Sequence, residues 1–413
     1  MVKLGLLERL AAGPVICAEG YLFELERRGY LQAGAYVPEV VLDFPEQVEN
    51  LHRDFLRAGS DVIEAFTYYA HREKLRLIGR ESDLEPMNRA ALAMAKKVAA
   101  EGDALVAGNI CNTNVFAIGD AVVAKQVRAM FEEQVGWAVE AGVDFIVAET
   151  ISWLGEAEIA LEVMRQTKLP TVVTFALHRD GYMREGVAAD EAAKRIADKG
   201  ADVVGLNCAR GPRTMMPYVR KIRDAVAIHV AALPVPYRTT VEEPTFQSLT
   251  EKDMNCAYCI PDGRSFPVAL DPFQVTRYEI AEFGRDAAAA NIRYLGVCCG
   301  AGPHHIRALA EALGRRRPPV ASRLTCLSTS RSEPIRASSE KIEISPRTSG
   351  WRDGPWQARR PVHSCLTRIA AKREADFSRA RTTTGRLLCA NSGRSPTVPK
   401  QAGPGNAKPS FVL

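Results

Sequence analysis

Three cysteines in two short motifs carry the strongest chemical signal in the sequence. Cys298 and Cys299 are adjacent and flanked by glycine in the run GVCCG, and Cys208 ends the run GLNC. Adjacent cysteines rarely pair as a disulfide, whereas three converging thiolates would bind zinc tightly and leave a fourth coordination position open, as in a catalytic site. Free cysteines are also commonly buried as small apolar residues. The metal site therefore depends on a fold that brings the two motifs together.

Eight short apolar runs, separated by long amphipathic stretches, predict that fold. The runs are Val15–Glu19, Asp61–Tyr68, Ala104–Ile110, Asp144–Glu149, Thr171–Leu177, Asp202–Cys208, His229–Val235 and Arg293–Cys299. Apolar runs that are separated by helices indicate parallel strands buried on both faces. Eight such units in roughly 300 residues predict an α/β fold, the (β/α)8 TIM barrel. An open doubly wound sheet is the alternative, but the sequence has no obvious glycine-rich dinucleotide loop.

The carboxyl ends of barrel strands carry the reactive groups of such enzymes. In the predicted barrel this end carries all three cysteines, together with Glu19, Glu149 and a tyrosine pair that includes Tyr69. Asn109 and Asn207 also stand at predicted strand ends. Because three thiols converge on one predicted face, we favour a metal site over three unrelated buried cysteines.

The two cysteine motifs resemble the zinc signature of the homocysteine S-methyltransferase family. Longer runs are similar to its betaine-using members, for example LHRDFLRAGSDVIEAFTYYAHREKL at 51–75 and RYLGVCCGAGPHHIRALAEAL at 293–313. The resemblance covers about residues 5–314. It implies a zinc-dependent methyltransferase that moves a methyl group from betaine to homocysteine, giving methionine and dimethylglycine.

The residues themselves, apart from the resemblance, also suit methyl transfer to a zinc-bound thiol. An alkyl thiol has a pKa near 8.5, so little thiolate exists at pH 7. Coordination to zinc deprotonates a thiol outright, and the bound sulfur can then attack a methyl group on a cationic nitrogen or sulfur. No separate general base is required.

The resemblance also implies roles for residues that bind the substrates. Glu149 matches the position that receives the α-ammonium of homocysteine, although a carboxylate there could instead stabilise a helix N-terminus. Tyr69 and Tyr36 match aromatic positions of the donor site, Tyr36 standing where the betaine enzymes have tryptophan. Aromatic faces attract quaternary ammonium groups, but tyrosines at strand ends are often packing residues.

The sequence departs from the family at two substrate positions. Ala18 stands where the family usually has an aspartate, and Glu19 follows it. Glu19 can replace that aspartate only if the strand ends at Ala18, because neighbouring strand residues face opposite sides; otherwise Glu19 caps the helix that begins near Tyr21. Thr150 replaces a tyrosine of the donor pocket, and Trp153 is a candidate substitute.

These departures leave the methyl donor open. Betaine is the first choice, and other onium donors with the same acceptor are the alternative: proline betaine, dimethylsulfoniopropionate or S-methylmethionine. A non-catalytic barrel that binds zinc or an amine is a further alternative. A zinc hydrolase is disfavoured, because hydrolases usually use His and carboxylate ligands.

Two other candidate ligand groups are set aside. Cys256 and Cys259 have the spacing of a zinc knuckle, but no second pair accompanies them, and they fall in a long insertion between the last two strands. That insertion is expected to cover the mouth of the barrel. His304 and His305 follow the CCG motif at the start of a helix, where a surface or packing role is expected.

Composition divides the chain into two domains. Residues 1–318 contain the predicted barrel, whereas residues 319–413 are rich in Ser, Arg and Pro and lack periodicity, which predicts a disordered tail. The chain has a formal net charge of +5, and its basic excess lies in that tail. Scattered arginines without interleaved aromatics do not indicate nucleic-acid binding.

The sequence indicates a cytoplasmic protein. No apolar run approaches the roughly 20 residues of a membrane-spanning helix, and the N-terminus lacks the uncharged core of a signal peptide. The ten cysteines are then expected to be free thiols or metal ligands. The tail does not resemble the arm through which the mammalian betaine enzymes assemble, so homo-oligomer formation stays open.

Overall fold

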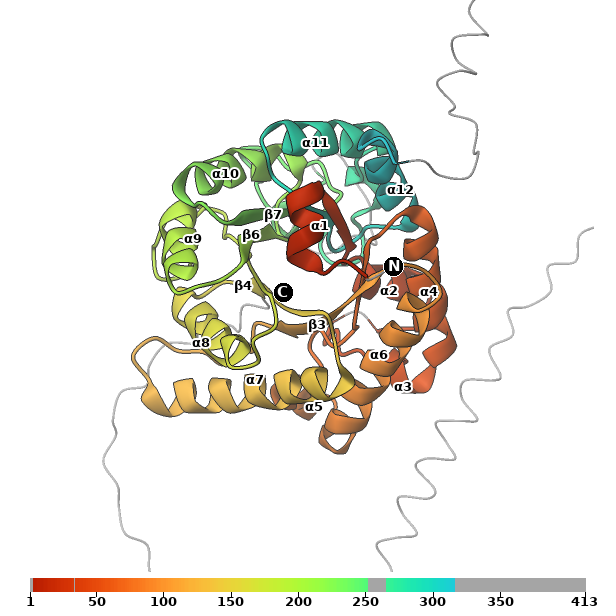
Figure 1. The fold of residues 1–413 in the computed structure, drawn as a ribbon, viewed down its shortest axis with the longest axis vertical. Helices are drawn as coiled ribbons and strands as arrows, with labels where there is room; N and C mark the ends of the chain where they lie inside the picture. Colours follow the sequence, from red (N-terminus) through yellow and green to blue (C-terminus); the bar gives the residue numbers. More distant parts are fainter. Residues whose placement is uncertain (1–2, 33, 252–264, 316–413) are drawn as a thin grey trace, which may run out of the picture. The chain divides into compact units, whose positions relative to one another are not determined.

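All eight apolar runs form parallel strands that pair in chain order (Figure 1). The computed structural model describes residues 3–32, 34–251 and 265–315. The pairs Val15–Tyr294 and Cys17–Gly296 join the first strand to the last and close the barrel. The strands are β1 Val15–Ala18, β2 Val62–Glu64, β3 Leu105–Cys111, β4 Phe145–Ile151, β5 Thr171–Phe175, β6 Val203–Asn207, β7 His229–Leu233 and β8 Tyr294–Val297. The predicted (β/α)8 TIM barrel is confirmed.

The amphipathic stretches form helices that surround the barrel and bury their apolar stripes against it (Figure 1). Proline at the first turn starts α4 and α10, and Gly142 in a left-handed conformation ends α7. The helices are α1 Leu6–Ala12, α2 Tyr21–Arg27, α3 Val40–Asp43, α4 Pro45–Ala58, α5 Arg72–Leu77, α6 Leu84–Ala99, α7 Ala121–Ala141, α8 Leu154–Arg165, α9 Ala189–Asp198, α10 Pro212–Ala225, α11 Arg277–Ala289 and α12 Pro303–Ala312. Short 3-10 turns lie at η1 Glu81–Asp83, η2 Phe246–Ser248 and η4 Asp271–Phe273.

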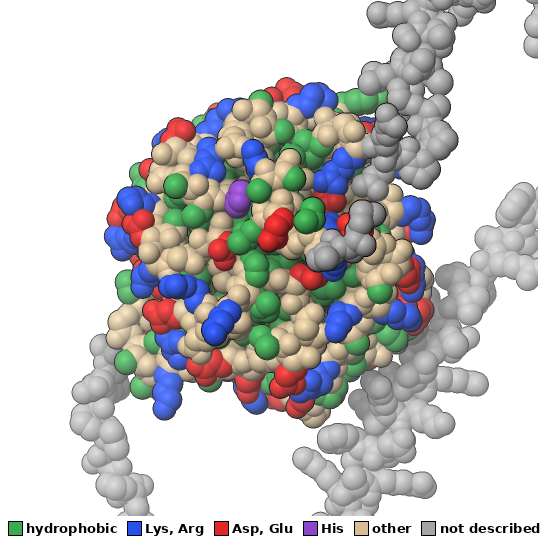
Figure 2. Space-filling view, in the orientation of Figure 1, with side chains coloured by type: hydrophobic (Ala, Val, Ile, Leu, Met, Phe, Trp, Pro, Cys, Tyr) green, Lys and Arg blue, Asp and Glu red, His purple; other side chains and the backbone are tan. Residues whose placement is uncertain are grey.

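Helix α1 closes one end of the barrel. Its Leu6 and Leu10 are buried in the same cluster as Phe145 and Tyr294 of the barrel interior, and Figure 1 shows α1 lying across the opening. On this face acidic and basic side chains are interspersed (Figure 2). Because α1 precedes β1 and fills the amino ends of the strands, the carboxyl ends are left to build a site.

The strands differ in length from the predicted runs at the carboxyl ends. β2 ends at Glu64 rather than Tyr68, because the backbone turns so that the Thr67 amide bonds to the Ala65 carbonyl at 2.7 Å. β8 ends at Val297 rather than Cys299, and β4 runs on to Ile151. The apolar character of these segments comes from burial at the barrel mouth, which strand periodicity cannot distinguish from burial in the sheet.

The insertion between β7 and β8 is described in part. The Phe246 amide donates to the Ala209 carbonyl at 2.8 Å, and its ring stacks on Tyr237, so this part lies over the end of β6. The Cys256 and Cys259 pair and the 319–413 tail lie outside the described residues. No helix within the described ranges is long and apolar enough to cross a membrane.

Candidate metal centre and active site

The three predicted ligand cysteines meet at the carboxyl end of the barrel. The sulfur atoms of Cys208, Cys298 and Cys299 all lie within 4.8 Å of one another, and those of Cys298 and Cys299 are 3.8 Å apart. Zinc–sulfur bonds of about 2.3 Å in a tetrahedron place two sulfurs about 3.8 Å apart. All three side chains are buried. The donor set therefore fits a soft, thiophilic metal ion without rearrangement of the backbone.

The ends of β6 and β8 position these thiols through backbone contacts with β7 and the residue after it. Cys208 has a left-handed backbone with φ of 56°, and its amide bonds to the Leu233 carbonyl at 3.0 Å. The Cys298 amide bonds to the Pro234 carbonyl at 2.9 Å. A left-handed conformation is rare for residues other than glycine and often marks a functional site.

The first glycine of each motif serves the barrel rather than the metal. A Cβ at Gly205 would lie 2.0 Å from the Ala231 carbonyl oxygen, and one at Gly296 would lie 2.0 Å from that of Cys17. Both positions face a neighbouring strand too closely for any side chain. The glycines thus let β6 and β8 hold the register that brings Cys208 and the Cys298 pair together.

A chain of three buried carboxylates and two amides lies beside the thiols. Asn207 Nδ2 donates to Glu149 Oε2 at 2.8 Å and to Glu19 Oε2 at 3.2 Å. Asn109 Nδ2 donates to Glu149 Oε1 at 2.6 Å and also to Glu64. Glu19, Glu64 and Glu149 are thereby linked across β1, β2, β3, β4 and β6.

Glu19 points toward the thiols rather than capping a helix. β1 ends at Ala18, and α2 has no side-chain cap. A Glu19 oxygen, a Glu149 oxygen and the Cys298 sulfur lie within 4.8 Å of one another. Glu19 Oε1 is buried and has no hydrogen-bond partner among the described residues. The geometry required for a relocated carboxylate is met, and its role in binding homocysteine stays a prediction.

Burial and mutual repulsion set the charge state of the site. Burial, followed by repulsion from neighbouring carboxylates, raises the pKa of Glu19 and of Glu149, and burial raises the pKa of Glu64 to about 7. Hydrogen bonds from the thiols of Cys298 and Cys299 lower the pKa of Cys208. Three acidic side chains and a thiolate in one buried site favour a bound cation.

A small cavity opens between the thiols and the carboxylates, and aromatic rings form its wall. Tyr21 stacks on Phe66 with ring centroids 5.6 Å apart, and the Tyr21 hydroxyl lies 3.1 Å from His52 Nδ1. The lining residues are Glu19, Tyr21, Leu22, Glu64, Ala65, Phe66, Tyr68, Glu149, Cys298 and Cys299. The cavity thus combines acidic groups, aromatic faces and two of the three thiols.

The two predicted donor tyrosines are buried outside this lining. Tyr36 stacks on Phe23 at 5.5 Å, and its hydroxyl has no hydrogen-bond partner among the described residues. Tyr69 contacts the Lys74 ammonium, which lies 3.8 Å from its ring centroid, and packs against Tyr68. Tyr68, which sequence reasoning did not single out, contacts the cavity instead. The donor roles of Tyr36 and Tyr69 stay predictions.

Trp153 does not line the cavity in place of the missing tyrosine. Its ring packs against Phe116 at 5.9 Å, with the Arg184 guanidinium 5.5 Å from its centroid. Thr150 itself contacts the site, because its hydroxyl lies 3.3 Å from Glu149 Oε2 and accepts from Asn207 at 2.9 Å. Thr150 is thus part of the hydrogen-bond network that links the carboxylates.

Sequence reasoning assigned no role to Glu64, Asn109 or Asn207. The signal for Glu64 was a carboxylate inside the apolar run DVIEAF, where a charged side chain must have a buried partner or a ligand. The signal for the asparagines was their place at strand ends. Only the folded barrel shows that their amides connect the carboxylates.

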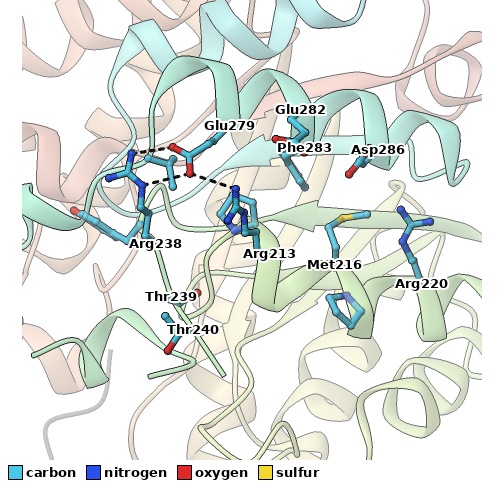
Figure 3. Close-up of a pocket in the computed structure, with 14 residues that line it drawn as sticks. Arg213, Met216, Arg220, Arg238, Thr239, Thr240, Glu279, Glu282, Phe283 and Asp286 are labelled. Atoms are coloured by element: carbon cyan, nitrogen blue, oxygen red, sulfur yellow. Dashed lines mark hydrogen bonds and ion pairs between the residues drawn. The ribbon is translucent and has the colours of Figure 1, made fainter. Parts of the chain in front are cut away.

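A second, larger groove lies on the outside of the barrel between α10 and α11 (Figure 3). Figure 3 shows Arg213 and Arg238 on either side of Glu279, and Arg238 Nη2 lies 2.9 Å from a Glu279 oxygen. Over the whole lining three arginines face three carboxylates, so the charges balance, and no cysteine lines the groove. The cavity at the thiols is therefore the candidate active site.

Comparisons with known proteins agree with this site. The family described as Homocysteine S-methyltransferase matches residues 18–313. The betaine–homocysteine S-methyltransferase 1 of Danio rerio is 39% identical over 323 residues, covering 76% of this chain and 77% of the relative. The S-methylmethionine–homocysteine S-methyltransferase of Pongo abelii is 34% identical over 331 residues, covering 78% of this chain and 85% of the relative.

Among solved structures, the homocysteine methyltransferase MmuM of Escherichia coli in its metallated form shares the fold. Its TM-score is 0.57 at 18% identity, and the match covers 74% of this chain and 98% of that protein. At this identity the likeness concerns the barrel alone.

Proposed function

Since the chain belongs to the homocysteine S-methyltransferase family, we propose that it transfers a methyl group from glycine betaine to homocysteine, giving methionine and dimethylglycine. The observation that carries the proposal is the meeting of Cys208, Cys298 and Cys299 beside an acidic, aromatic cavity. A soft metal at the thiols would hold the acceptor sulfur, and the cavity would hold cationic groups.

The three cysteines would hold zinc as thiolates. Zinc in this donor set would supply a fourth coordination position at which the homocysteine thiol loses its proton and stays nucleophilic. Hydrogen bonds from the other two thiols lower the pKa of Cys208, so it would be the first of the three to lose its proton. The backbone hydrogen bonds of Cys208 and Cys298 position two of these sulfurs, and Cys299 is adjacent to Cys298 in the chain.

The carboxylates would bind the amino group of homocysteine. Glu149 accepts hydrogen bonds from Asn109 and Asn207, which fix its orientation, and Glu19 has an oxygen free to accept another. An α-ammonium between these two residues would donate charge-assisted hydrogen bonds to both. This contact would set the direction in which the acceptor sulfur points.

The donor would enter with its onium group in the same cavity. Aromatic faces and carboxylates both attract a methylated cation, by about 0.5–2 kcal/mol for each ring, and Tyr36 and Tyr69 are proposed to support that end of the site. In the transfer, the acceptor sulfur forms a bond to the methyl carbon while the carbon–nitrogen bond breaks. The bonding electrons remain on the nitrogen, so the product amine is neutral at that atom.

S-methylmethionine is the second candidate donor. The S-methylmethionine–homocysteine S-methyltransferase of Pongo abelii matches 78% of the length of this chain. The reaction would be the same at the acceptor, with a carbon–sulfur bond broken instead of a carbon–nitrogen bond.

A donor assay tests the proposed function. Purified, zinc-loaded protein is given homocysteine with glycine betaine, proline betaine, dimethylsulfoniopropionate or S-methylmethionine in separate reactions, and methionine is quantified. We expect methionine to form fastest with glycine betaine. Absence of methionine with every donor would overturn the enzyme assignment, and faster turnover of another donor would transfer the assignment to that donor.

A further inference from the structure

Glu64 is a buried carboxylate of the cavity that the proposed reaction leaves without a role. It is 3% exposed and lines the cavity beside Glu19 and Glu149. Its two oxygens accept hydrogen bonds from opposite sides, one from the Cys17 thiol at 3.3 Å and one from the Asn109 amide. These hydrogen bonds stabilise the ionised form of the carboxylate against burial, which raises the pKa of Glu64 to about 7.

The charges around the cavity are not balanced by the protein. Three carboxylates line it, and no Lys or Arg is among its lining residues in the described part of the chain. The α-ammonium of homocysteine can neutralise one carboxylate. The remaining negative charge must therefore be met by the second substrate or by protons.

Two unpartnered acceptor atoms indicate that a ligand belongs in this cluster. Glu19 is 7% exposed, and its Oε1 has no hydrogen-bond partner among the described residues. Asn109 is 3% exposed, and its Oδ1 is likewise unpartnered. Buried acceptors without partners are costly, so N–H groups of a bound cation would satisfy both.

We propose that Glu64 selects the methyl donor by its net charge, favouring a donor with a net positive charge over a net-neutral one. The inference rests on the proposed function and deepens it: glycine betaine stays the expected donor, and Glu64 reduces the margin by which it is preferred over S-methylmethionine. S-methylmethionine carries a sulfonium and an ammonium against one carboxylate, so it is cationic overall. Glycine betaine carries one cation and one carboxylate and is neutral overall. A negative Glu64 attracts the first more strongly and repels the carboxylate of the second.

Substitution of Glu64 by glutamine isolates this charge. Glu64→Gln keeps the shape of the side chain and one oxygen that can accept from Asn109 or Cys17, but it removes the negative charge. Glu64→Asp keeps the charge in a shorter side chain. Glu156→Gln is the matched control, because Glu156 is 1% exposed and accepts from the Thr113 amide away from the cavity lining.

The measurement is the ratio of kcat/KM for S-methylmethionine to kcat/KM for glycine betaine, in zinc-loaded protein with homocysteine saturating. Glu64→Gln is expected to lower this ratio at least about tenfold, which corresponds to about 1.4 kcal/mol. Glu64→Asp and Glu156→Gln are expected to leave it within about threefold of the wild-type value. A wild-type ratio in soluble Glu64→Gln protein overturns the inference.

A second measurement covers the case in which Glu64→Gln does not fold. Choline and glycine betaine share the trimethylammonium group, but choline is cationic overall. Wild-type protein loaded with zinc and homocysteine is expected to bind choline at least about tenfold more tightly than glycine betaine. Tighter binding of betaine overturns the inference. Whichever of the two ligands binds more tightly, formation of methionine by the wild-type protein supports the proposed function. Absence of methionine with every donor would refute the proposed function independently of the role of Glu64.

Discussion

Replacing Cys298 by serine should remove most of the affinity for zinc while leaving the barrel folded. The Cys298 sulfur lies 3.8 Å from that of Cys299 and within 4.8 Å of that of Cys208, so it is one of three proposed ligands. Zinc sites of four protein ligands bind with about 10–16 kcal/mol, or about 2.5–4 kcal/mol for each ligand. Loss of one thiolate should therefore weaken zinc binding roughly a hundredfold to a thousandfold.

The assay is a competition for zinc against a chromophoric chelator at neutral pH, with metal content measured after gel filtration. Cys111→Ser is the matched control, because Cys111 is a buried free thiol at the end of β3 that belongs to no proposed ligand set. Circular dichroism checks that both variants are folded. If Cys298→Ser retains one zinc per chain with wild-type affinity, the proposed metal centre is wrong whatever the activity.

Three further outcomes follow from the same geometry. Glu149→Gln should raise the KM for homocysteine about 10- to 150-fold through loss of a charge-assisted hydrogen bond of about 1.5–3 kcal/mol; an unchanged KM in steady-state assays would remove Glu149 from the ammonium site. Gly296→Ala should lower the free energy of unfolding in urea by about 1–3 kcal/mol or more, because its Cβ would lie 2.0 Å from a carbonyl oxygen of β1. Gly136→Ala, in open space on α7, should not lower it. Burial raises the pKa of Glu156 from 4.5 to about 7, so the folded state binds a proton that the unfolded state releases, and stability falls by about 3 kcal/mol as pH rises from 4.5 to 7. Glu156→Gln should flatten that part of the pH profile in urea unfolding, and an unaltered profile would contradict the shift.

The sequence alone predicted the barrel and the meeting of the thiols for a clear physical reason. Each parallel strand is buried on both faces, so it appears as a short apolar run that recurs between amphipathic helices. Topology then brings the carboxyl ends of β6 and β8 to one end of the barrel, although Cys208 and Cys298 are far apart in the chain. Once the strands were identified, the place of the cysteines followed.

The carboxylate network could not be predicted in the same way. Asn207, Glu19 and Glu149 come from the ends of three different strands. The hydrogen bonds from Asn207 to both carboxylates depend on side-chain reach rather than on periodicity. Glu64 was hidden inside an apolar run, where its carboxylate faces the barrel interior. Which tyrosine lines the cavity depends on where β2 ends, and strand ends are the least predictable feature of a sequence.

Backbone conformation explains how some side chains at the carboxyl ends of the strands turn toward the site. Cys208, one residue after β6, and Thr150, near the end of β4, have positive φ of 56° and 58°. A left-handed residue reverses the direction in which the chain presents its side chains, so a group that alternation would place outward can face the cavity. Glu19 achieves the same result by following the end of β1 at Ala18. At the carboxyl ends of the strands, side-chain alternation therefore no longer predicts which residues face the site. The conformation of the turn after each strand decides this instead.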